Sequence, residues 1–190
     1  MCYIRKPTRM VFKNARIGLS LLALIAATAS LSAQQKGLQI VPKVQGDHLL
    51  VSFELRDGLT PDVRAAIDSG LKTIFTYTVD LRLDAAGWFD RTVAQAVVTN
   101  TVEYDNLQRK FTLERRIDGR NAGSETTMDA VRVREWMTTV KEEPLFTTRV
   151  LQRNREYYVR VSATARPSYG SILWPFGSGT SAQTRFVFFR

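Results

Sequence analysis

The sequence predicts a mainly β domain, an antiparallel β-sandwich or curled sheet of about eight strands with two short packed helices. Three observations support this fold class. Apolar and polar residues alternate with a period of two along most of the chain, as in strands that bury one face. Short segments containing Gly, Asn or Asp separate these runs, and two other segments carry helix-capping residues instead.

The clearest strand covers residues 71–84, where every second side chain belongs to one predicted core face. That face consists of Leu71, Thr73, Phe75, Tyr77, Val79, Leu81 and Leu83. Residues 38–44 and 48–55 are expected to form a hairpin, because Gly46 in the segment between them accepts a positive φ. Further strands are expected at residues 91–104, 107–117 (with Leu107 directed inward), 145–151, 156–166 and 184–190.

Four residues predict the first helix. Thr60 supplies the N-cap hydroxyl, and Pro61 suits the first helical position. Asp62 places a negative charge in the first turn, and Gly70 marks the end of the helix. These signals agree on one short helix between two strands.

The second helix is expected over about residues 127–140. Thr126 and Asp129 resemble a capping box, and Glu142 and Glu143 before Pro144 resemble a helix exit. We expect this helix to lie across the sheet, with its tryptophan as a buried anchor. Its apolar stripe at helical spacing consists of Ala130, Val133, Trp136, Met137 and Val140.

Residues 1–33 are expected to be a cleaved secretory signal peptide, followed by a single β-rich domain over residues 34–190. Five basic residues and no acidic residue accompany the apolar run at residues 17–31, and Met10 is an alternative start that would shorten this leader. Polar residues bound the run on both sides, whereas a membrane-spanning helix needs about 20 apolar residues. We therefore expect export to the periplasm or beyond, with no transmembrane helix in the mature protein.

The charge of the expected mature domain is only weakly positive. Five of the 27 basic residues lie in the leader, so 22 remain against 18 acidic residues, and the excess lies after residue 90. Export argues against a nucleic-acid partner. A small positive excess fits an envelope protein, an anionic lipid or a glycan as partner, and it equally fits an ordinary solvated surface.

The chain lacks the residues that several classes of enzyme require. His48 is the only histidine, and the only cysteine, Cys2, lies in the leader. Zinc sites with nitrogen and sulfur ligands and Cys–His pairs are therefore excluded from the mature domain. His48 lies beside a tight turn, no glycine-flanked serine elbow accompanies it, and no phosphate-binding loop occurs. We expect no catalytic residue of these classes, no cofactor and no metal.

Asp84 and Asp90 remain candidates for chemistry, because they flank a short turn between two expected strands. Two hypotheses stay open. The domain is either a non-enzymatic envelope module that binds a protein, lipid or glycan, or a hydrolase that uses carboxylates alone. Acidic residues at turns usually cap backbone amides, which favours the binding module.

A candidate binding segment covers residues 167–176. Its large apolar side chains are set among Pro, Gly and Ser without strand or helix periodicity, and aromatic residues on loops are frequent interaction hot spots. Arg160 and Arg166 nearby would add attraction for an acidic partner or a lipid surface. The alternative is that the rings fold back and close the open end of the sandwich. The four apolar residues are Tyr169, Ile172, Trp174 and Phe176.

Four segments, taken in order, resemble one known family. They are Gly87-Trp88-Phe89-Asp90, the hairpin from Tyr104 to Phe111, the strand from Glu156 to Val161, and Trp174-Pro175-Phe176. With these segments, the chain from about residue 38 to residue 189 resembles the exported bacterial domain of unknown function 4390. The resemblance implies export and a β-rich fold, and it carries no catalytic residue to this chain. The Gly- and Ser-rich residues 168–181 depart from the family's pattern.

We predict that the mature protein begins between residues 31 and 35 and lies outside the cytoplasm. The basic and apolar halves of the leader are the reason for this expectation. The intact mass of the native protein, purified from its own cells, measures the cleavage position. An uncleaved chain in the soluble cytosol would contradict the prediction.

Overall fold

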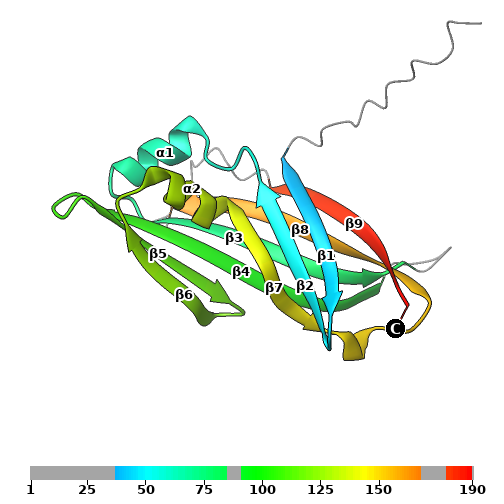
Figure 1. Ribbon diagram of the computed structural model, residues 1–190. Coiled ribbons are helices and arrows are strands. Elements are labelled where there is room, and N and C mark those ends of the chain that lie inside the picture. Colours follow the sequence, from blue (N-terminus) through cyan, green and yellow to red (C-terminus); the bar gives the residue numbers. More distant parts are fainter. Residues whose placement is uncertain (1–36, 85–90, 168–178, 190) are drawn as a thin grey trace, which may run out of the picture. The chain divides into compact units, whose positions relative to one another are not determined.

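The computed structural model of the chain describes residues 37–84, 91–167 and 179–189. Within these ranges the chain forms two antiparallel sheets and two α-helices, so the predicted mainly β, sandwich-like fold is confirmed (Figure 1). The helices are α1 (Pro61–Asp68) and α2 (Ala130–Thr138), and a short 3-10 turn covers Thr148–Val150. The strands are β1 (Leu38–Gln45), β2 (His48–Leu55), β3 (Thr73–Leu83), β4 (Arg91–Asp105), β5 (Lys110–Ile117), β6 (Arg120–Thr127), β7 (Thr139–Thr147), β8 (Arg155–Pro167) and β9 (Thr180–Phe188).

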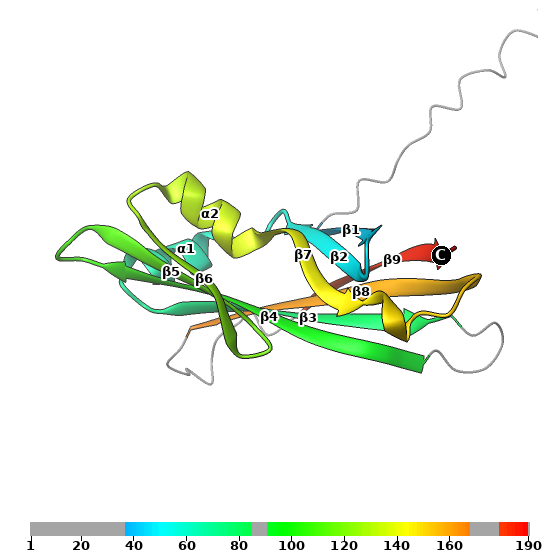
Figure 2. The ribbon, with the colours of Figure 1, turned by 60° about the horizontal axis from the view of Figure 1, so that its bottom comes forward.

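The larger sheet has the strand order β6-β5-β4-β3-β8-β9, and the smaller sheet has the order β1-β2-β7. The smaller sheet lies over one part of the larger sheet, and α1 and α2 lie over another part of the same face (Figure 2). At one edge the two sheets are joined directly, because the Thr184 hydroxyl of β9 donates to the Ile40 carbonyl of β1 at 3.1 Å. The helices and the smaller sheet therefore together cover one face of the larger sheet.

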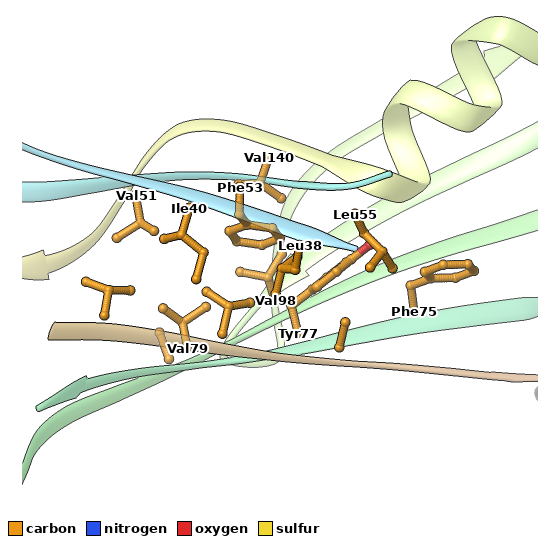
Figure 3. Close-up of a cluster of buried hydrophobic side chains, with 14 of the residues drawn as sticks. Leu38, Ile40, Val51, Phe53, Leu55, Phe75, Tyr77, Val79, Val98 and Val140 are labelled. Atoms are coloured by element: carbon orange, nitrogen blue, oxygen red, sulfur yellow. The ribbon is translucent and has the colours of Figure 1, made fainter. Parts of the chain in front are cut away.

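The core lies between the two sheets and is built from alternate residues of each strand. Phe53 of β2 and Tyr77 of β3 meet across it, with ring centroids 4.8 Å apart. Burial of each such side chain contributes about 1.5–3 kcal/mol. This burial holds the sheets together. Figure 3 labels the central members of the cluster, which are Leu38, Ile40, Val51, Phe53, Leu55, Phe75, Tyr77, Val79, Val98 and Val140.

The predicted signals for α1 are confirmed. The Thr60 hydroxyl accepts a hydrogen bond from the Val63 amide at 3.3 Å, and Pro61 is the first residue of the helix. Gly70 ends it with a φ of 82°, a left-handed conformation that glycine adopts without a Cβ clash. Leu71 follows this turn and is 43% exposed, so its predicted place on the core face is wrong.

The second helix is shorter than predicted. It spans Ala130–Thr138, and its N-cap is Asp129, whose carboxylate accepts from the Val131 amide at 2.8 Å. The expected capping box from Thr126 to Asp129 is therefore wrong. The helix ends at Thr138 because the next residue, Thr139, already pairs with Glu54 of β2.

The residues expected to form a helix exit belong instead to β7, and the strand expected at residues 145–151 begins six residues earlier. Glu142 has a φ of 46°, and its amide donates to the Ser52 hydroxyl of β2 at 2.8 Å. Pro144 follows in the same strand, where the pairing with β2 shifts register. A bulge thus accommodates residues that do not fit a regular ladder. After β7 the chain forms the 3-10 turn, not a strand.

The strand expected at residues 107–117 is also corrected. Residues 106–109 form a turn in which the Asp105 carboxylate accepts from the amides of Leu107 and Gln108 at 2.8 and 3.0 Å. Leu107 is 96% exposed, so its predicted inward position is wrong. The turn leads into β5, and a tight turn at Asp118 and Gly119, both with positive φ, leads into the unpredicted β6.

Three side chains of the larger sheet hold the C-terminal end of α2. Arg115 of β5 donates to the carbonyls of Trp136 and Thr139, both at 2.9 Å. Asn100 of β4 accepts from Arg115 at 2.8 Å and donates to the Trp136 carbonyl at 2.9 Å. These bonds satisfy carbonyls that a helix end leaves without partners.

Burial changes the acid–base properties of this group. The Tyr77 hydroxyl of β3 donates to the Met137 carbonyl at 2.6 Å, and burial raises the pKa of Tyr77, an effect that Arg115 partly opposes. Burial also lowers the pKa of Arg115, against the influence of Glu143 and Tyr77. We call Arg115, Asn100 and Tyr77 the α2 clamp.

Trp136 packs against the core but is only half-buried, so its predicted role as a buried anchor is confirmed only in part. Its ring lies near two guanidinium groups, with Arg115 at 4.9 Å and Arg132 at 5.5 Å from the ring centroid. Gly123 of β6 leaves space beside the ring, since a Cβ there would lie 3.5 Å from it. The buried positions of α2 belong to Val133 and Met137.

We predict that Asn100→Leu lowers the free energy of unfolding by about 1–3 kcal/mol, because Arg115 loses a buried acceptor. The matched control is Gln95→Leu, on the exposed face of the same strand, with an expected change within about 0.5 kcal/mol. Urea unfolding of the two variants measures the difference. Equal costs for both substitutions would show that the α2 clamp contributes nothing.

Candidate functional site

An open groove lies between α1 and α2. Its main hollow has a volume of about 290 Å³. The floor comes from buried or half-buried residues of the core, whereas the walls come from exposed residues of the two helices. The floor residues are Leu59, Ile67, Phe111 and Val133, and the wall residues are Arg64, Asp68, Ala130, Val131 and Arg134.

The two helices run antiparallel along this groove. The last turn of α1 and the first turn of α2 line the main hollow, whereas the start of α1 and the last turn of α2 line a neighbouring hollow of about 340 Å³. Leu59 and Arg134 line both hollows. We treat the two hollows as one site and call it the α1–α2 groove.

One end of the groove is apolar and open to solvent. Val131 on its wall is 73% exposed, and Met128, just before α2, is 71% exposed. Phe111 on the floor packs against Tyr104 with ring centroids 4.6 Å apart. Leu107 lies in the turn between the strands that carry these two rings. An exposed apolar residue on the wall of an open hollow, such as Val131, is typical of interaction sites.

The other end of the groove, at the neighbouring hollow, is more basic, because Arg56 and Arg134 line it. Arg64 lies on the α1 wall of the main hollow, which Arg134 also lines. The guanidinium groups of Arg64 and Arg134 are exposed, and within the described ranges neither group has a hydrogen bond or an ion pair. Arg56 donates to Gln39 at 2.9 Å. Asp57 and Asp68 also line the groove, Asp57 at the basic end and Asp68 at the apolar end.

Two of the predicted binding residues, Arg160 and Arg166, lie in the described ranges, and they are not part of this groove. Arg160 and Arg166 lie on β8, where Val159, Val161 and Ala163 alternate with them and face the core. The two arginines therefore lie on the opposite, outer face of the larger sheet. Tyr169, Ile172, Trp174 and Phe176 lie outside the described residues.

Of the two candidate catalytic residues, the structure describes only Asp84. Asp84 forms an ion pair with Arg185 of β9 at 3.4 Å, and its amide donates to the Glu156 carbonyl. Asp90 lies outside the described residues. His48 is exposed at the start of β2, beside the turn at Gly46.

The acidic groups with shifted pKa values lie on the surface in ion pairs. Arg132 donates a hydrogen bond of 2.7 Å to Glu125, which lowers the pKa of Glu125. Lys141 donates one of 2.6 Å to Glu135, which lowers the pKa of Glu135. No group of three metal-ligating side chains occurs among residues 37–84, 91–167 and 179–189. Within the same ranges no helix has the length and apolarity to span a membrane.

A further hollow of about 230 Å³ lies between the C-terminal half of α2 and β5. Its basic residues are Arg115, Arg132 and Lys141. Arg115 is occupied by the α2 clamp, and the other two pair with Glu125 and Glu135. The α1–α2 groove, with its unpaired guanidinium groups, is therefore the stronger candidate site.

Sequence reasoning missed this groove because its residues come from three separate segments, at residues 56–68, 111 and 130–138. A local signal did exist. Val131 lies away from the apolar stripe of α2, and Met128 precedes its N-cap, so both apolar residues fall on solvent-facing positions. An apolar residue off the stripe of a short helix marks a surface that packing within the domain does not explain.

Comparison with known proteins adds the family. No curated protein and no solved structure matches the chain. One family model matches residues 34–168, which is more than half of the chain, and it is described as a domain of unknown function, DUF4390. The matched range includes both helices, both walls of the α1–α2 groove and the α2 clamp. The chain therefore belongs to the DUF4390 family.

Proposed function

We propose that this protein is an exported, non-enzymatic domain of the periplasm or cell envelope that binds a partner protein in the α1–α2 groove. The observation that carries the proposal is the groove itself, in which an apolar end with Val131 adjoins unpaired guanidinium groups. The leader at residues 1–33 supports export.

The shape of the groove favours a protein segment over a whole small molecule. Its main hollow of about 290 Å³ is open to solvent between the two helices, whereas small-ligand pockets bury most of the ligand's surface. Two helices on a sheet instead offer a shallow channel for a few side chains. Peptide segments use such channels by inserting apolar anchors from one face of a helix.

We predict that Val131→Glu abolishes capture of the partner from envelope extracts by the tagged mature domain. The new carboxylate would place a charge in the apolar end of the groove. Val41→Glu is the matched control, since Val41 is 61% exposed on β1 of the smaller sheet, and it should capture the partner normally. Quantitative mass spectrometry of both eluates gives the readout. Equal capture by the two variants would contradict the proposal.

Substitution of Asp84 and Asp90 tests the alternative that the domain is a carboxylate-dependent hydrolase. We predict that replacing both with Asn leaves partner capture unchanged. Thermal unfolding should also change little, because Asp84 takes part in a surface ion pair with Arg185 and such pairs contribute about 0–1 kcal/mol. A hydrolysis of nitrophenyl esters or glycosides by the purified domain, lost in this variant with the fold intact, would contradict the prediction.

A further inference from the structure

The polarity of the side chains that line the α1–α2 groove changes along its length. At the end of α1 and the start of α2, apolar side chains dominate, with Ile67, Phe111 and Val131 around the main hollow. Toward the start of α1 and the end of α2, Arg134 and Arg56 line the wall beside one carboxylate, Asp57, and Arg64 lies opposite Arg134 on the wall of the main hollow. A ligand that combines apolar side chains with a carboxylate therefore complements the groove.

Arg64 and Arg134 are the residues able to receive the anionic end. They lie on opposite walls of the groove, one on each helix, and both are exposed. Neither guanidinium group has a hydrogen bond or an ion pair among residues 37–84, 91–167 and 179–189. Guanidinium groups form paired hydrogen bonds with carboxylates, and these bonds are stronger than neutral ones.

The length of the groove sets the size of the segment. The eight residues of α1 extend over about 12 Å, which corresponds to about two turns of a helix laid alongside. Within two turns, side chains at positions i, i+3 or i+4 and i+7 lie on one face. Two or three side chains of a partner helix therefore reach the groove.

We propose that the groove receives an amphipathic helix of the partner protein, with apolar side chains on Ile67, Phe111 and Val131 and with a carboxylate between Arg64 and Arg134. This inference rests on the proposed function and adds the chemistry of the partner. Asp68, one helical turn after Arg64, disfavours a second carboxylate at the apolar end and favours a basic residue of the partner helix there.

Two fluorescent peptides of about 15 residues test the proposal, a length that suffices for a helix in an Ala-rich sequence. Both carry two Leu residues on one face, followed one turn later by either two Glu or two Gln residues. We expect the purified mature domain to bind the Glu peptide about tenfold more tightly than the Gln peptide in fluorescence anisotropy. This preference should weaken as the salt concentration rises from about 0.05 to 0.5 M.

Matched double variants assign the preference to the groove. Arg64→Gln with Arg134→Gln should remove the preference for the Glu peptide, and Arg160→Gln with Arg166→Gln, on the outer face of β8, should retain it. Equal binding of both peptides to the unchanged domain would overturn the proposal. So would binding of neither peptide, or a preference that survives in the first variant.

Vesicles of phosphatidylglycerol and phosphatidylcholine separate a peptide partner from an anionic lipid. We expect the unchanged domain and the variant with both Arg64 and Arg134 replaced to sediment equally little with these vesicles. Sedimentation lost in the variant of these two arginines, without a peptide preference, would assign them to lipid headgroups and overturn the proposal. If Val131→Glu abolishes partner capture while the peptides are not distinguished, the proposed function stands and only the acidic helix is wrong.

Discussion

The hydrogen bonding of the half-buried guanidinium of Arg115 is the interaction on which the arrangement of the domain depends. The guanidinium lies under α2, where desolvation of a charge is costly unless hydrogen bonds compensate. Its partners are two carbonyls at the end of α2 and the side chain of Asn100. The charge thereby favours a helix whose C-terminal carbonyls point to this position and whose chain continues directly into β7.

The smaller sheet and the candidate site both follow from this constraint. Because α2 ends at Thr138, β7 begins at once and completes the smaller sheet beside β2. The same helix forms one wall of the α1–α2 groove. The bidentate pair of Arg132 with Glu125, at 2.7–3.0 Å, fixes the other side of α2 to β6. The position of the groove is therefore determined by polar contacts as well as by core packing.

The sequence predicted those parts of the fold that depend on local signals. The alternation in β3, the caps of α1 and the hairpin of β1 and β2 all appear as expected, because each depends on neighbouring residues. The boundaries of α2 and the existence of β6 were missed for a physical reason. The residues of β6, from Arg120 to Thr127, include no large apolar side chain, so no alternation marks a strand that pairs only with β5. The end of α2 depends on Arg115 and Asn100, which are remote in sequence.

The candidate site was predictable to a smaller extent than the fold. An exposed Val131 was visible from helical periodicity, but its proximity to Ile67 and Phe111 depends on the packing of two helices on one sheet. The outer-face position of Arg160 and Arg166 follows directly from alternation along β8. That these two arginines are remote from the groove could not be predicted, because the sequence does not show which face of the sheet the helices cover.

The strand order of the larger sheet has a consequence for how the chain folds. β3 lies at the centre, yet one of its two partners is β8, and β2 likewise completes its pairing only with β7. Contacts of such long sequence separation form slowly, and strands that wait for a partner present unpaired backbone groups. A chain synthesised from its N-terminus therefore carries β2 and β3 with open edges until the last third has emerged. During that interval the unpaired edges are templates for pairing between neighbouring chains.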